Sequence, residues 1–317
     1  MSGAKLKLKP TTRTAGKKSA GKVDLFINSL RFPSVKKIPN IKYGTQGEEL
    51  VLDIYQPRKR GEKIPVLVNV HGGFYIYGDK KQRRGFCAYM ADKGVAVLNV
   101  MYGQAPKYLF IDQIRNVCLV LKWIEENHEK YGFDLSKVAI AGDGTGAYIA
   151  SMAAVANTSS EVRENFDLTG INYLIKTILL FRGYYDMGLL LNSSTITESA
   201  EEKLKHVILG PGVARFKENI FSKLSPINYV NTDFPDTFLA YDREEFDRAE
   251  QASRLKNILR RNGIPHWEFR NIHDRYVRAL ETKNSPIHNI KQCIIDAAAF
   301  LRLSLNNQIT NDEYHEI

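Results

Sequence analysis

The sequence predicts an α/β fold in which a mostly parallel, eight-stranded sheet is flanked by helices and carries a helical cap. From about residue 40 onward, strand-like and helix-like segments alternate, which is typical of a wound sheet rather than of a sandwich or a helix bundle. Several strand-like segments are nearly continuous apolar runs, as expected when helices cover both faces of a parallel sheet. With 317 residues, the chain is long enough to bury one large core.

Strands are expected wherever short apolar runs lie between turn-forming residues. The clearest are the runs VLVNV, VAVLNVM and KTILLF, which have no alternating polar face. The expected strands are residues 41–44, 50–55, 65–70, 95–101, 137–141, 175–181, 237–241 and 267–272.

Helices are expected where apolar residues recur every three or four positions. In residues 111–124 these residues form one buried stripe, and 247–262 and 287–305 behave similarly. Residues 184–227 interrupt the alternation, because they are too long for an ordinary loop and contain the helical pattern EEKLKHVIL. We expect this stretch to form an inserted helical cap over the strand ends.

The net charge of +10 is concentrated near the N-terminus. Residues 1–22 carry +7 and no acidic residue, which leaves +3 for the rest of the chain. This segment has little to bury, so we expect a disordered basic arm ahead of a main domain at 23–317. The arm could contact nucleic acid or an anionic membrane, but it lacks interleaved aromatic residues, and a solvated arm without a specific partner is the preferred interpretation.

Composition excludes several other classes of protein. No apolar run reaches the roughly 18 to 20 residues needed to span a bilayer, and the N-terminus lacks the apolar core of a secretory signal, so a cytoplasmic location is expected. The cysteines at positions 87, 118 and 293 are far apart and have no histidine in metal-ligand spacing. Neither a disulfide framework nor a metal site is expected.

The first segment that suggests chemistry is VNVHGGFYIYGD, residues 68–79, directly after an expected buried strand. It contains His71, Gly72 and Gly73. Adjacent glycines let backbone N–H groups approach a developing negative charge, as in an oxyanion hole, although a simple Gly-Gly turn would contain the same residues.

The second segment is KVAIAGDGTGAY, residues 137–148, in which a strand pattern breaks into a glycine-rich turn and continues as a helix. Gly142 and Gly146 match the outer glycines of the G-x-S-x-G turn, whose strained central residue presents a reactive serine. Here the central residue is Gly144. Both outer glycines of the motif are therefore present, but the central serine that would carry the reactive hydroxyl is absent.

Taken together, these segments and the intervening VAVLNVMYGQAP resemble the α/β-hydrolase superfamily in order and spacing. More narrowly they resemble the carboxylesterase branch related to hormone-sensitive lipase, with its HGG loop, its Y-R-L-A-P segment and its G-D-S-A-G turn. Tyr102, Ala105 and Pro106 keep the middle segment, whereas Gly103 and Gln104 depart from it. The resemblance covers roughly residues 40–305 and implies a capped hydrolase fold, an ester-cleaving Ser-His-Asp site, and no metal or organic cofactor.

The resemblance also assigns roles to further residues. It implies a triad acid within DREEF, where Glu245 and Glu244 both stay open, and a general base at His273, with His288 as a weaker substitute. It implies an oxyanion hole formed by Gly72, Gly73 and Thr145, supported by His71 and Asp143.

Gly144 decides how this site is interpreted, because acyl transfer needs an oxygen nucleophile and glycine has none. Thr145 has a hydroxyl, but we expect it one residue into the helix, with its N–H in the oxyanion hole. The first interpretation is a catalytically impaired, ligand-binding or regulatory pseudo-hydrolase with a small apolar or ester-like ligand under the cap. The second is an active carboxylic-ester hydrolase whose serine was replaced deliberately in this chain. The third is an interaction module that uses the basic arm.

Overall fold

The computed structural model describes residues 28–45, 47–59, 61–191, 220–243, 245–270 and 286–309. The basic arm predicted at 1–22 lies outside the described residues. So does the central part of the cap insertion predicted at 184–227.

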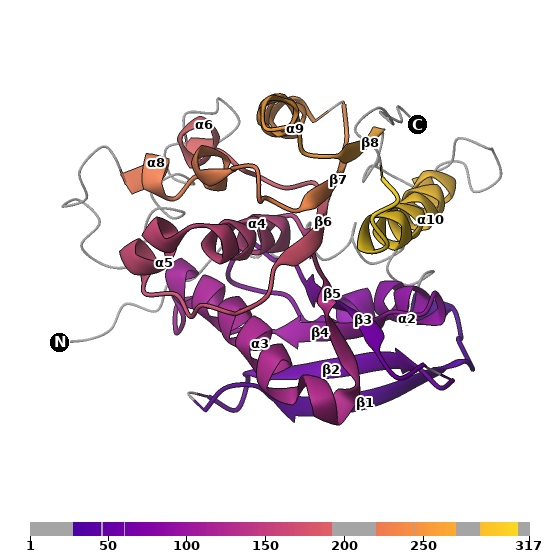
Figure 1. Cartoon of the computed structure of the whole chain (residues 1–317). Coiled ribbons are helices and arrows are strands. Elements are labelled where there is room, and N and C mark those ends of the chain that lie inside the picture. The colour runs from indigo at the N-terminus through magenta and orange to yellow at the C-terminus, as the bar shows by residue number, and fades with distance from the viewer. Residues whose placement is uncertain are drawn as a thin grey trace, which may run out of the picture.

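One sheet of eight strands runs through the described residues in the order β1-β2-β4-β3-β5-β6-β7-β8 (Figure 1). β1 and β4 both pair antiparallel with β2, whereas all other neighbouring strands are parallel. The predicted mostly parallel, eight-stranded sheet is thus confirmed. The strands are β1 (Val35–Lys42), β2 (Val51–Pro57), β3 (Ile64–Val70), β4 (Ala96–Met101), β5 (Phe133–Asp143), β6 (Ile175–Phe181), β7 (Asp236–Tyr241) and β8 (His266–Arg270).

The first strand was predicted at 41–44, and this was wrong in its bounds. β1 covers Val35–Lys42, and about two thirds of its residues are exposed. It lies at one edge of the sheet, where lysines and a proline discourage pairing with other chains and few apolar residues are needed. A search for apolar runs therefore finds only its last residues.

Helices cover both faces of the sheet (Figure 1). One face is covered by α3 (Phe110–Tyr131), α4 (Thr145–Thr158) and α9 (Phe246–Arg261). The opposite face is covered by α2 (Arg84–Asp92) and α10 (Pro286–Leu305). The helices predicted at 111–124, 247–262 and 287–305 are confirmed. The shorter elements are η1 (Lys80–Arg83), α5 (Ser160–Phe166), α6 (Met187–Leu191), α8 (Ile220–Lys223) and η3 (Pro226–Tyr229).

The central strands are buried on both faces, which explains their continuous apolar sequence. In β3, Val66, Val68 and Val70 pack into the core under α3 and α4, whereas Leu67 packs into the core under α2 and α10. Successive side chains of a strand point to opposite faces, so both sets must be apolar here. Within the described ranges, no helix has both the length and the apolar character of a bilayer-spanning segment.

A buried network of polar side chains crosses one end of the sheet. Asp53 of β2 is 2% exposed and accepts from Lys80 of η1 and from Lys37 of β1, the latter at 2.8 Å. Asn99 Nδ2 donates to the Lys80 carbonyl at 2.6 Å, and Asn69 Nδ2 donates to Asn99 Oδ1 at 2.8 Å. Burial alone would raise the pKa of the Asp53 carboxyl, but hydrogen bonds from both lysines bring that pKa below its ordinary value. The network connects η1 to the four strands β1, β2, β3 and β4.

Also buried is His71, which follows β3 directly. It is 0% exposed, and its ring stacks on Tyr102 with centroids 4.3 Å apart. Its Nδ1 lies 2.8 Å from the carbonyl oxygen of Gly72, and the Tyr102 hydroxyl donates to the His71 carbonyl at 2.7 Å. Burial lowers the pKa of the imidazole to about 4, against a smaller opposing contribution from the Gly72 carbonyl. The ring is therefore neutral near pH 7.

We predict that Asp53→Ala lowers the free energy of unfolding by about 3 kcal/mol, because it leaves the Lys80 ammonium buried without its carboxylate. The matched control is Glu48→Ala, which removes an ion pair to Lys42 between two exposed side chains and should leave the urea midpoint unchanged. Equal midpoints for the two variants would show that the buried pair does not contribute to stability.

We also predict that the free energy of unfolding falls as the pH is lowered from about 6.5 to about 4. The unfolded chain takes up a proton on His71 within this window and the folded chain does not, so the loss from this group approaches about 3 kcal/mol. Urea unfolding at several pH values measures it. His71→Gln should show a shallower dependence on pH, and identical slopes would contradict the prediction.

Candidate functional site

The turn from β5 into α4 has the backbone geometry that a strained catalytic turn requires. β5 ends at Asp143, and Gly144 follows with φ 57° and ψ −117° before α4 begins at Thr145. The Gly144 N–H donates to the Phe181 carbonyl at 2.8 Å. Its carbonyl accepts from Ala147 at 3.1 Å and thus starts the helix. A conformation that side chains rarely adopt is fixed here from both sides.

The two outer glycines of this turn are required by crowding. A Cβ at Gly142 would lie 2.2 Å from the carbonyl oxygen of Gly146, and one at Gly146 would lie 2.3 Å from that of Val70. At Gly144, by contrast, a Cβ would meet no atom of the described residues within 4 Å, its chain neighbours aside. The central position therefore has open space for a side chain that the sequence does not supply.

The HGG loop lies directly against this turn. A Cβ at Gly72 would be 2.5 Å from the Asp143 carbonyl oxygen and 3.9 Å from the Thr145 nitrogen. At Gly73, with φ 142°, a Cβ would collide with the Tyr77 carbonyl. Among the described residues, the N–H groups of Gly73 and Thr145 have no hydrogen-bond acceptor. The loop and the turn thus form a cradle, defined here as Gly72, Gly73, Gly144 and Thr145.

The two departures from the Y-R-L-A-P segment support the same loop. Gln104 Nε2 donates to the Gly78 carbonyl at 2.7 Å and ties down the end of the HGG segment. At Gly103 a Cβ would lie 2.3 Å from the Tyr108 ring, so glycine admits that ring. Both substitutions therefore fit this chain's own packing and do not open the site.

Asp143 is held between two arginines behind the cradle. Arg182 donates to both of its carboxylate oxygens at 3.1 Å, and Arg83 donates to Oδ2 at 3.2 Å. The Arg83 guanidinium also lies over the rings of Phe86 and Phe181, at 4.9 and 5.5 Å. Burial alone would raise the pKa of the Asp143 carboxyl, yet the charges of Arg182 and Arg83 hold that pKa below its ordinary value. Asp143 is therefore an ionised support.

The sheet edge that carries the turn also presents an acidic residue that sequence reasoning missed. Asp242 follows β7 directly and is 3% exposed. Phe181 of β6 pairs with Asp143 on one side and with Ala240 of β7 on the other. The end of β7, and with it Asp242, therefore lies at the same edge of the sheet as the turn. The available signal was its place at the carboxyl end of a parallel strand, where functional residues of open α/β sheets gather.

The acidic residues predicted from the sequence fare differently. Glu245 lies three residues past β7, immediately before α9, and pairs with Arg248 of that helix at 2.5 Å. Glu244 and the predicted base His273 lie outside the described residues. His288 belongs to the first turn of α10. The roles assigned to these residues stay predictions.

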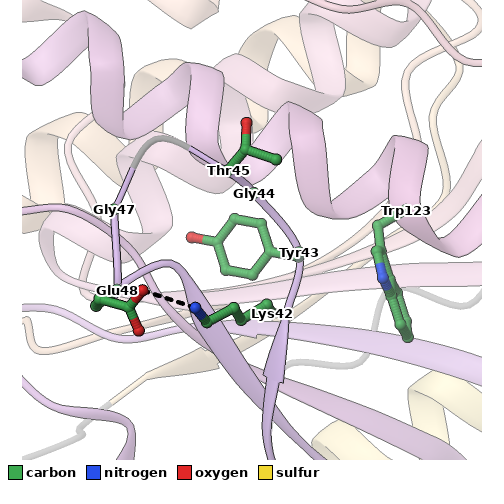
Figure 2. A pocket seen from close by; sticks show the side chains of 7 residues that line it. All are labelled: Lys42, Tyr43, Gly44, Thr45, Gly47, Glu48 and Trp123. Carbon is green, nitrogen blue, oxygen red and sulfur yellow. Dashed lines mark hydrogen bonds and ion pairs between the residues drawn. The ribbon is translucent and has the colours of Figure 1, made fainter.

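A groove of about 650 Å³ lies elsewhere, between the β1–β2 connection and α3 (Figure 2). Lys42 donates to Glu48 at 2.7 Å on one side, and the Trp123 ring lies on the other side of Tyr43. The Tyr43 hydroxyl donates to the Met101 carbonyl at 2.8 Å. The described residues that line this groove do not include a nucleophile paired with a base. The cradle therefore remains the candidate site.

Comparison with known proteins places this geometry in a family. A family model described as BD-FAE matches residues 52–259. Esterase LipQ from Mycobacterium tuberculosis is 26% identical over 254 residues, which cover 77% of this chain and 58% of LipQ. Esterase LipC from the same organism is 25% identical over 226 residues, covering 69% of this chain and 54% of LipC. The chain thus spans somewhat more than half the length of these curated relatives.

Solved structures share the fold at low identity. Esterase B from Lactobacillus rhamnosis superposes with a TM-score of 0.75 at 21% identity, over 94% of this chain and 95% of that chain. An esterase from Pyrobaculum calidifontis gives 0.67 at 17% identity, over 95% and 94%. With the BD-FAE model spanning well over half of its residues and this fold, the chain belongs to the BD-FAE family of esterase-like α/β-hydrolases.

Proposed function

We propose that this chain is an esterase-family protein that has lost acyl transfer and retains the pocket for binding a small apolar or ester-like ligand. The single observation that carries the proposal is Gly144, which occupies the strained central position of the turn, where the described residues leave room for a side chain. The N–H groups of Gly73 and Thr145, which have no acceptor within the described part of the chain, lie beside it.

The reaction of serine esterases explains why the missing serine oxygen at position 144 has such a large effect on turnover. In this class of enzyme a serine oxygen attacks the ester carbonyl while the oxyanion donors stabilise the charge that develops. Gly144 has no oxygen to form the acyl intermediate. Removal of such a nucleophile costs about 10⁶-fold in turnover in a well-studied protease and leaves only what binding and the oxyanion donors supply.

Two exposed aromatic residues support an apolar ligand. Phe74, which follows the cradle residue Gly73, is 57% exposed, and Phe246 at the start of α9 is 77% exposed. Contiguous apolar surface can serve as a binding site, so these two side chains are candidates for contact with an apolar ligand. Phe74 lies in the loop after β3 and Phe246 is the first residue of α9, after β7, so both follow the carboxyl ends of parallel strands, as the cradle does.

For the acid of the ancestral triad we propose Asp242, with Glu245 as the alternative. Asp242 is 3% exposed and follows β7 directly, at the sheet edge that carries the turn, whereas Glu245 lies three residues farther along, immediately before α9. His273 remains the proposed base.

A cytoplasmic location remains an expectation, and the interaction module built on residues 1–22 concerns a segment outside the described residues.

We predict no measurable hydrolysis of p-nitrophenyl butyrate by the parent chain, and turnover at least about 10³-fold above it in Gly144→Ser. Gly144→Ala is the matched control, because it adds the same Cβ at the same positive φ without a hydroxyl. An ester hydrolase whose serine was replaced deliberately makes the same prediction, with turnover of the variant at the level of related esterases. Parent turnover equal to that of Gly144→Ser would overturn the proposal.

The acid can be identified in the Gly144→Ser protein. Asp242→Asn should lower kcat by about 10³-fold or more, because the base would lose the carboxylate that orients it. Glu245→Gln should change kcat by less than about threefold, because it removes only an ion pair within one helix turn. Circular dichroism confirms that both variants fold. The reverse order of effects would assign the role to Glu245.

A further inference from the structure

We propose that the groove between the β1–β2 connection and α3 is a second binding site, which takes a free α-amino acid with an apolar side chain. The groove has a volume of about 650 Å³, which lies within the range of small-molecule sites in proteins. Its described lining includes none of the cradle residues. The site is therefore separate from the pocket to which the proposed function refers.

The first argument is the pair of charges on one side of the groove. Lys42 Nζ and Glu48 Oε1 are 2.7 Å apart, and the two side chains are 58% and 89% exposed. An ion pair between exposed side chains contributes little to stability, so its members can turn to a ligand at little cost. In an α-amino acid the carboxylate and the ammonium are attached to the same carbon and also lie side by side. The carboxylate can accept from Lys42 while the ammonium donates to Glu48.

The second argument is charge balance. The lining carries one positive and one negative charge, and the neighbouring pair of Lys107 and Glu49 adds one of each. A ligand with a single charge would compensate one member of the Lys42–Glu48 pair and leave the other without its partner. An uncharged ligand would form none of the stronger hydrogen bonds that join two charged groups. A zwitterion compensates both members and keeps the groove neutral.

The third argument is the apolar side of the groove. Trp123 belongs to α3, and its ring lies on the other side of Tyr43 from the Lys42–Glu48 pair (Figure 2). This ring is partly exposed, packs against the core and contacts the ring of Tyr131, with centroids 5.3 Å apart. An indole that is already fixed by packing offers apolar surface without a further loss of side-chain entropy. An apolar side chain of the ligand, above all an aromatic one, fits this surface.

The loop that carries the charged side is held in place without a ligand. The Tyr43 N–H donates to the Leu50 carbonyl at 3.2 Å, and the Leu50 N–H donates to the Gly47 carbonyl at 3.3 Å. A Cβ at Gly47 would lie 2.4 Å from the Tyr108 hydroxyl oxygen, so glycine lets the loop pack against that side chain. A site that is formed in advance loses less entropy on binding than one that must first be ordered.

The test compares L-phenylalanine with two analogues that each lack one charge. Phenethylamine lacks the carboxylate and 3-phenylpropanoate lacks the ammonium, whereas the aromatic ring is the same in all three. Isothermal titration of the full-length protein at pH 7 should show that L-phenylalanine binds about 10-fold more tightly than either analogue, because one hydrogen bond between charged groups contributes about that much.

Two substitutions assign each charge of the ligand to its partner. Lys42→Gln should lower the affinity for L-phenylalanine to about that for phenethylamine, because the carboxylate loses its charged donor. Glu48→Gln should lower it to about that for 3-phenylpropanoate, because the ammonium loses its charged acceptor. Trp123→Ala should weaken the binding of all three compounds by removing their apolar contact.

The matched control is Glu250→Gln, which removes the ion pair of Arg254 and Glu250 on α9, outside the groove. The side chains of this pair are 47% and 34% exposed, so it is also an exposed pair. This variant should bind L-phenylalanine as tightly as the parent chain does.

Three outcomes would overturn the amino-acid site. They are the absence of L-phenylalanine binding at millimolar concentration, equal affinities for L-phenylalanine and both analogues, and binding that neither Lys42→Gln nor Glu48→Gln weakens. The last outcome would place the amino acid elsewhere on the protein. None of them concerns the loss of acyl transfer, which the hydrolysis of p-nitrophenyl butyrate tests separately.

Discussion

The site depends on one steric constraint, the close approach of β3 and the HGG loop to the turn between β5 and α4. Backbone carbonyls of Val70, Asp143 and Gly146 occupy the positions where Cβ atoms of neighbouring residues would stand. Glycine is thus imposed by backbone packing at three positions around the cradle. None of these contacts involves a side chain at position 144. The donors are therefore aligned by the packing of main chain on main chain, and the cradle does not need a side chain at position 144 to keep its shape.

Charge reinforces this packing from behind. Asp143 connects the turn to Arg83 at the end of η1 and to Arg182 just after β6, so three separate segments meet at one carboxylate. Asp53 does the same for Lys37 and Lys80 at the other end of η1. Removing one member of such a buried group leaves its partners uncompensated. The segment that follows the HGG loop is thereby anchored at both ends.

The sequence predicts those features that depend on local pattern. β3, β4 and β6 were placed within about one residue because strands covered on both faces must be apolar throughout. The bounds of β1 were not predicted correctly, because a strand at the edge of the sheet is partly exposed to solvent and lacks a continuous apolar run. The Asp53–Lys80 pair was not predicted, because its two residues are 27 positions apart in the sequence and are brought together only by the folded sheet. Asp242 was passed over although the strand predicted at 237–241 ends directly before it, because the sequence alone does not show which carboxylate of DREEF the fold buries.

The positive φ of Gly144 has a consequence for how such a chain changes over generations. A residue with a Cβ held at φ near +57° carries roughly 1 to 2 kcal/mol of backbone strain, from which glycine is exempt. Exchange of serine for glycine therefore makes the fold easier to maintain. The reverse exchange must reintroduce that strain. Selection for folding alone therefore favours glycine over serine at this position.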